Sequence, residues 1–261
     1  LWYLAGVRRR GPQLTDSNTY GDYVCGAYIG ADEGFMLVAP RMGGSSYQQE
    51  AEGKSWIDGV RIIDESEKPE NVLVEVVKPF RLKGRGVSLD DRAWTQSELV
   101  FRHTLSDSPI SLASEIIAPM RMIKDTEEIT LMQKAGQITD EVYDEVLKYL
   151  KVGVFDYEIA HEVDYQFAKR GADHPSFVTG VRFSSPSKGQ ASSEQRTTGR
   201  GLEKGDAITF DFGTCYKGYC SDFGRTVFAG KPPIEFRKIH DLVMEAQAAA
   251  IEKMVSGTIT A

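Results

Sequence analysis

Two aspartates lie eleven residues apart in the segment GDAITFDFGTCYKGYCSDFGRTVFAG. Alternating apolar residues predict a strand over Ala207–Phe212, with Asp211 on its less apolar face. A second strand over Tyr219–Phe228 carries Asp222. A turn at Cys215–Gly218 places the two aspartates directly opposite each other, with Cβ atoms about 4.5–5.5 Å apart. The spacing therefore predicts a pair of carboxylates on one face of a hairpin.

Paired carboxylates repel, so a sheet that holds them together needs something to offset the repulsion. One carboxyl can be protonated, a cationic side chain can lie between them, or both can bind cations. Arg225 is close in sequence, but alternation places it on the other face of its strand. Two metal ions about 3.5–4 Å apart on shared carboxylates form a known hydrolytic arrangement. The spacing leaves these alternatives open beside a simpler one, in which one aspartate is a solvated residue on an exposed face.

Helices and a long loop must position this hairpin. Apolar residues recur with a period of about 3.6 after an acidic N-terminal turn at residues 125–128. The pattern predicts helices over Asp125–Lys151, Asp156–Arg170 and Glu235–Val255. Few apolar residues and many Ser, Gly and Thr over Pro175–Arg200 predict a strand followed by a long loop. We place a boundary near residues 118–124, which divides the chain into domains over residues 1–120 and 121–261.

The first 120 residues alternate short apolar segments with helical patterns. We predict strands over Tyr23–Ile29, Phe35–Ala39, Val60–Asp64 and Gly86–Leu89, and helices over Tyr47–Gly53, Pro69–Phe80 and Thr95–Thr104. Val7–Tyr20, rich in Arg, Gly and Pro, reads as a long loop. Such alternation is typical of a small α/β domain with a partly parallel sheet.

The composition is that of a globular protein, since 41% of the 261 residues are hydrophobic and 26% are charged. These proportions exclude disordered, collagen-like and disulfide-scaffold classes. The formal net charge is −7 and neither half is basic, so we expect neither nucleic acid nor a membrane as a partner. No apolar run approaches the length of about 18 residues that spans a bilayer. Three cysteines without CxxC spacing favour a reducing, cytoplasmic setting.

Residues 116–258 resemble the first half of the pita-bread metallohydrolases, which include prolidase, aminopeptidase P, methionine aminopeptidase and creatinase. The matching segments are APMRMIKDTEEITLMQKAG, HPSF at 174–177, LEKGDAITFDFG and GYCSDFGRTV. The upstream part, beginning with WYLAG, resembles the N-terminal domain of the prolidase and creatinase branch. The resemblance implies a creatinase-type α/β domain over 1–120 and the first half of an α+β pita-bread catalytic domain over 121–261.

The resemblance also implies a metal-dependent hydrolase acting on a peptide or similar C–N bond, most simply an Xaa-Pro aminopeptidase or dipeptidase. By position, Asp211 matches the aspartate that binds one metal through both oxygens, and Asp222 matches the one that bridges two metals. Two divalent ions (Mn, Co, Zn or Fe) suit such ligation, and a bridging water would be the nucleophile. Phe177 matches an aromatic residue that contacts substrate, although by pattern alone it is equally a core residue. The implied partners are a small peptide and a second copy of the chain in a homodimer.

Two departures from the family pattern stand beside this resemblance. The family completes its site with one His and two Glu from a downstream half, and none of the four histidines here follows Asp222 in a strand or loop. We therefore expect that the chain is truncated at both ends and that this segment alone is catalytically inactive. The peptidases also carry a His about 17–18 residues before the first aspartate, where this chain has Ser193 and Glu194; His174 is a partial substitute at most. A creatinase-like hydrolase without metal and a non-catalytic scaffold on the same fold are the alternatives.

Overall fold

The computed structural model describes residue 4 and residues 20–31, 34–82, 85–185 and 199–255. The chain forms two units, Leu1–Lys124 and Asp125–Ala261. Their boundary lies a few residues after Met120, the end of the first domain expected from the sequence. Most of the loop expected over Val7–Tyr20 lies outside the described residues.

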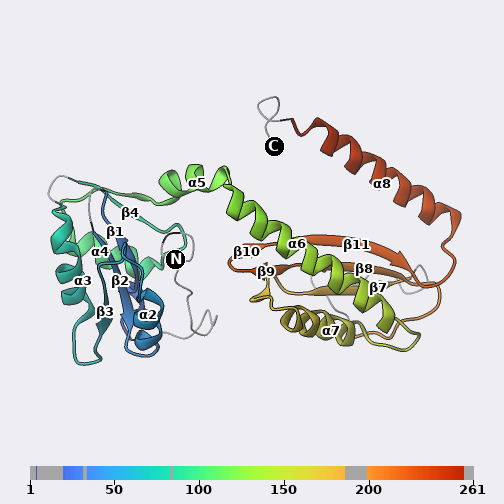
Figure 1. The fold of residues 1–261 in the computed structure, drawn as a ribbon, viewed down its shortest axis with the longest axis horizontal. Coiled ribbons are helices and arrows are strands. Elements are labelled where there is room, and N and C mark those ends of the chain that lie inside the picture. The colour runs from blue at the N-terminus through green and yellow to red at the C-terminus, as the bar shows by residue number, and fades with distance from the viewer. Residues whose placement is uncertain (1–3, 5–19, 32–33, 83–84, 186–198, 256–261) are drawn as a thin grey trace. The chain divides into compact units, whose positions relative to one another are not determined.

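The first unit contains a three-stranded sheet in the order β1-β2-β3, followed by a two-stranded parallel sheet of β4 and β5 (Figure 1). Strand β2 pairs antiparallel with β1 and parallel with β3, so the sheet is partly parallel as expected. The strands are β1 Gly26–Ile29, β2 Phe35–Pro40, β3 Gly59–Ile63, β4 Val87–Leu89 and β5 Ile110–Leu112. The α-helices are α2 Gly44–Ala51, α3 Pro69–Val77, α4 Thr95–Thr104 and α5 Ser114–Met122. Helix α5 contains Pro119, so it runs into the region of residues 118–124 where the sequence predicted a domain boundary.

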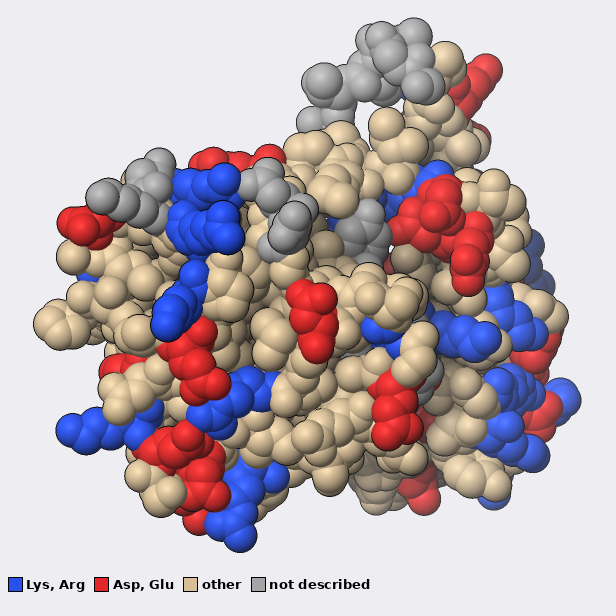
Figure 2. All heavy atoms as spheres, turned by 60° about the vertical axis from the view of Figure 1, so that its left-hand side comes forward, with Lys and Arg blue, Asp and Glu red and all other residues tan. Residues whose placement is uncertain are grey.

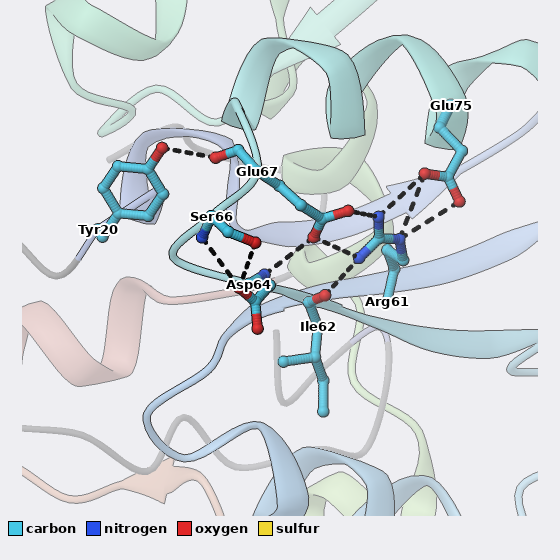
Figure 3. A network of polar contacts seen from close by, with 7 residues as sticks. All are labelled: Tyr20, Arg61, Ile62, Asp64, Ser66, Glu67 and Glu75. Atoms are coloured by element: carbon cyan, nitrogen blue, oxygen red, sulfur yellow. Dashed lines mark hydrogen bonds and ion pairs between the residues drawn. The ribbon is translucent and has the colours of Figure 1, made fainter.

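A polar network joins β3 to the segment that leads into α3 (Figure 3). The Arg61 guanidinium lies between Glu67 and Glu75, at N···O distances of 2.6 and 3.1 Å. This pairing holds the pKa of Glu67 below its usual range. Asp64 accepts hydrogen bonds from the backbone and side chain of Ser66. Because Glu75 is well exposed and Glu67 is partly exposed, these ion pairs add little to the stability of the unit.

The charged surface in Figure 2 shows Lys and Arg side chains interspersed with Asp and Glu. No broad basic patch appears on this face, in keeping with a formal net charge of −7. Among the described helices, none is long and apolar enough to cross a bilayer.

The second unit begins with two helices, α6 Thr126–Val146 and α7 Asp156–Lys169. A short 3-10 helix, Leu147–Tyr149, extends α6 to nearly the predicted end. Asp125 and Glu128 form a capping box, in which each side chain accepts the other residue's backbone N–H at 2.9 and 2.8 Å. Glu128 also accepts a hydrogen bond from the Tyr219 hydroxyl at 2.8 Å. The cap thus connects the start of α6 to the hairpin that follows.

Replacing Asp125 by Ala should accelerate hydrogen exchange in the first turn of α6 by about five-fold, because loss of an N-cap costs about 1 kcal/mol. Asp125→Asn is the matched control, since Asn caps a helix as well as Asp does. Hydrogen exchange followed by mass spectrometry measures both variants. Equal exchange in Asp125→Ala and wild type would show that the cap contributes nothing.

A sheet in the order β11-β8-β7 packs against these helices through one face (Figure 1). Its strands are β7 Gly180–Ser184, β8 Ala207–Phe212 and β11 Phe223–Phe228, all antiparallel neighbours. A second small sheet consists of β6 His174–Pro175, β9 Thr214–Tyr216 and β10 Tyr219–Cys220. The core of the unit is formed by buried residues of α6, α7 and the larger sheet, including Ile138, Val142, Val146, Ile159, Val163, Phe167, Val181, Phe183, Ile208, Phe210, Phe212 and Phe223.

Two buried carboxylates hold the segment between Gly199 and the start of β8. Asp156, fully buried, accepts the backbone N–H of Gly199 at 2.9 Å. Asp206, also fully buried, pairs with Arg200 at 2.9 Å and accepts the Glu203 N–H. These contacts fix where β8 begins, and so where its later residues lie.

The last helix, α8 Ile234–Lys253, has no buried residue in the part of the chain that the structure describes. Its apolar side chains Ile239, Leu242 and Val243 are each at least 60% exposed. A contact between the Phe228 and Phe236 rings joins its first turn to the end of β11.

Candidate metal-binding face

Asp211 lies on the face of β8 that points away from the helices. Its neighbours Phe210 and Phe212 are fully buried, and Phe210 makes an edge contact with Tyr143 of α6. Because side chains alternate along a strand, Asp211 projects to the opposite side, where Thr209 is exposed. The alternation predicted for this strand is confirmed, and its bounds are as predicted.

The residues beside Asp211 on both neighbouring strands are glycines. Gly180 of β7 and Gly224 of β11 are its register partners. A Cβ added at Gly224 would meet no atom within 4 Å. On the β11 side, therefore, no side chain covers the strand face that Asp211 shares with Gly224.

The register of the hairpin differs from the prediction. Asp211 pairs with Gly224 and not with Asp222, because the turn is centred between Lys217 and Gly218. Both of these turn residues have positive φ, 48° and 83°, as in a two-residue type I′ turn, which suits the strand twist and favours glycine. The prediction of directly opposed aspartates, based on a four-residue turn, was wrong.

The shift amounts to two residues, which preserves the faces. A slip of one residue would exchange the two faces of a strand, whereas a slip of two does not. Phe223 lies opposite Phe212 and stacks on it, with ring centroids 5.1 Å apart, so the apolar faces of β8 and β11 coincide. Asp211 and Gly224 share the other face.

Asp222 lies in a break between two strands, where the sequence predicted one continuous strand over Tyr219–Phe228. Strand β10 ends at Cys220 and β11 begins at Phe223. Ser221 contacts Thr139 of α6, and Phe223 contacts Tyr143 one helical turn later. Asp222, exposed between these two anchored residues, projects to the side away from α6 by alternation. The side chains of both aspartates therefore lie on the same side of the sheet.

The other residues singled out in the sequence have varied surroundings. Phe177 lies half-buried in the bend between β6 and β7, outside the buried core cluster. His174 is exposed in β6, with its Nδ1 2.7 Å from the Pro175 carbonyl oxygen. Ser193 and Glu194 lie outside the described residues.

The chemistry of this face is that of oxygen donors. Two carboxylates on one open side of a sheet provide the hard ligands that divalent cations accept. Within the described residues, no group of three or more His, Cys, Asp or Glu side chains gathers as a complete metal site. The two aspartates therefore fit a metal centre as part of its ligand set.

A set of small hydroxyl residues beneath Asp222 was not found from the sequence. Thr139, Ser176, Thr214 and Ser221 are joined by hydrogen bonds around Gly213. The partners come from segments up to 82 residues apart, so no local pattern identifies them. The single available signal was the run of small residues on both sides of the turn.

Comparison with known proteins places this chain among peptidases. The sequence profile of metallopeptidase family M24 matches residues 130–261. An uncharacterized peptidase of Bacillus subtilis (strain 168) is 29% identical over 255 residues, covering 94% of this chain and 68% of that protein. An uncharacterized peptidase of Staphylococcus aureus (strain USA300) is 33% identical over 142 residues, covering 54% of this chain and 39% of that protein.

Solved structures show the same fold. A prolidase from Thermococcus sibiricus matches with a TM-score of 0.77 and 25% identity, covering 97% of this chain and 64% of that one. An X-Pro aminopeptidase from Thermotoga maritima matches with a TM-score of 0.66 and 25% identity, covering 84% of this chain and 59% of that one. The chain thus spans about three fifths of these solved chains. Its mixed α/β fold is that of the prolidases and aminopeptidases, and with a family match over half its length the chain belongs to metallopeptidase family M24.

Proposed function

We propose that the whole protein is a metal-dependent peptidase that cleaves small peptides at an Xaa-Pro bond, with Asp211 and Asp222 as ligands of a dinuclear centre. The similar solved proteins are named as a prolidase and an X-Pro aminopeptidase, which supports this substrate class. Residues 121–261 would then be the first half of a pita-bread catalytic domain. The observation that carries the proposal is the placement of two carboxylates on the same side of the sheet within the family-matched region.

The chain's own residues would have distinct roles in this centre. Asp211 and Asp222 would both hold the metal ions through their carboxylate oxygens. The two ions, when bound, would supply a water of lowered pKa as nucleophile. Gly224 leaves the β11 side of Asp211 open, and the half-buried Phe177 ring would form a wall of the substrate pocket. A second copy of the chain would complete a homodimer.

Removal of the metal tests the proposal. We expect exhaustive chelation to lower hydrolysis of an Xaa-Pro dipeptide by at least about 100-fold, and Mn²⁺ or Co²⁺ to restore it, because the bound water loses its activation without metal. A matched Xaa-Ala dipeptide measures the preference for proline. The assay uses the protein expressed from its complete gene, since the present chain spans only part of its relatives.

Unchanged hydrolysis after chelation would contradict the proposal and favour a creatinase-like reaction without metal. Metal binding without hydrolysis of any peptide would favour a non-catalytic scaffold. Equal rates for the Xaa-Pro and Xaa-Ala substrates would overturn the substrate class while leaving a metallopeptidase.

A further inference from the structure

Asp222 lies in the sequence between Ser221 and Phe223, and the side chains of both neighbours contact helix α6. The Ser221 hydroxyl lies 2.6 Å from the Thr139 hydroxyl, and the Phe223 ring lies 5.0 Å from the Tyr143 ring. Thr139 and Tyr143 are four residues apart on α6, so they lie on one face of the helix. The backbone of Asp222 is therefore held at both ends against a rigid element, although it belongs to no strand.

The hydroxyl groups of this contact belong to one set of hydrogen bonds. The Thr139 hydroxyl lies 3.0 Å from the Ala135 carbonyl and 2.6 Å from the Ser221 hydroxyl. The Ser221 oxygen accepts the Thr214 N–H at 3.0 Å, and its hydroxyl also lies 3.3 Å from the Thr214 carbonyl. Loss of the Thr139 hydroxyl, which is buried, would therefore remove the bond that joins Ser221 to α6 while Ser221 keeps its partners on β9.

The same segment is held from its other side by a close backbone approach. Ser176 donates its hydroxyl to the Ser221 carbonyl at 2.9 Å, and its N–H to the Gly213 carbonyl at 3.0 Å. A Cβ at Gly213 would overlap the Ser221 carbonyl oxygen and lie 2.5 Å from the Ser176 hydroxyl. Gly213 follows Asp211 by two residues, so this contact joins the two aspartate-bearing segments directly.

We propose that Thr139 is a positioning residue for the metal centre. Through Ser221 it fixes the backbone from which Asp222 projects, and so sets the distance between the Asp222 and Asp211 carboxylates. This inference rests on the proposed function, because it concerns the metal that those carboxylates would bind. Thr139 itself touches neither metal nor substrate.

The test is the affinity for Co²⁺, followed by its visible absorption on the whole protein. Thr139→Val keeps the shape of the side chain and removes the hydroxyl, and we expect it to weaken Co²⁺ binding by about 10–100-fold, as loss of outer-shell partners does. Thr139→Ser keeps the hydroxyl and should bind Co²⁺ as wild type does. Thr130→Val is the matched control, because Thr130 makes the same bond to the carbonyl four residues earlier on the exposed part of α6.

A second control separates positioning from stability. Val142→Ala removes buried side chain from the same helix without touching Ser221, and should lower stability while leaving the Co²⁺ affinity unchanged. If Thr139→Val does not fold, Ser221→Ala carries the same expectation, since it removes the other hydroxyl of the pair. Wild-type affinity in the folded variant overturns the inference, and so does equal weakening by Val142→Ala or Thr130→Val.

The Asp222→Asn variant distinguishes failure of the positioning role of Thr139 from failure of the proposed function. Co²⁺ affinity lost in Asp222→Asn but unchanged in Thr139→Val overturns the positioning role alone. Co²⁺ affinity unchanged in Asp222→Asn overturns both.

Discussion

Replacing Asp222 by Asn is expected to weaken divalent-metal binding by more than about 100-fold and to abolish peptide hydrolysis. The change removes a charged oxygen ligand, whereas loss of even an outer-shell partner costs about 10–100-fold. Asp222 is exposed and lies between strands, so asparagine should fit without cost to the fold. Asp211→Asn, on the same open face, should have an effect of the same order.

The measurement is metal content after dialysis, together with hydrolysis of an Xaa-Pro dipeptide by the whole protein. Asp140→Asn is the matched control, because it removes one carboxylate charge from an exposed position of α6. Retention of metal and activity in both Asp211→Asn and Asp222→Asn would show that this face holds no metal ligand. An equal loss in Asp140→Asn would point to a general effect of charge.

Replacing Phe212 by Ala is expected to lower the free energy of unfolding of the second unit by about 3–5 kcal/mol. The Phe212 ring is fully buried and contacts the rings of Phe167, Phe210 and Phe223. Truncation would leave a cavity between β8 and α7, behind the strand that carries Asp211. The variant therefore tests how strongly the core supports the candidate metal face.

Hydrogen exchange of peptides from β8 and β11 measures this loss. Thr209→Ala, on the exposed face of the same strand, should change stability by no more than about 0.5 kcal/mol. All three tryptophans lie in the segment Leu1–Lys124. The midpoint of the unfolding transition followed by tryptophan fluorescence should therefore be the same in Phe212→Ala as in the wild type. A loss below about 1 kcal/mol in Phe212→Ala would mean that the core repacks around the missing ring.

Regular elements of the second unit follow closely from local patterns. Strand β8 has the predicted bounds, and α7 ends one residue before the predicted Arg170. Alternation and helical periodicity describe one segment packing against one apolar surface, which is a property of neighbouring residues. The same patterns failed at Ser221-Asp222, where the ladder is interrupted and Ser176 donates to the carbonyls of Ser221 and Gly213.

The sequence by itself singled out Asp211 and Asp222 as candidate ligands and determined which face of the strand bears Asp211, because both depend on residue type and on a period of two. Only the tertiary structure decided how the two aspartates are placed relative to each other. The register depends on the positive φ angles of Lys217 and Gly218, and one two-residue turn in place of a longer one moves every pair. The anchoring of Ser221 on Thr139 joins residues 82 positions apart, and such a contact exists only once the helix and hairpin have packed together.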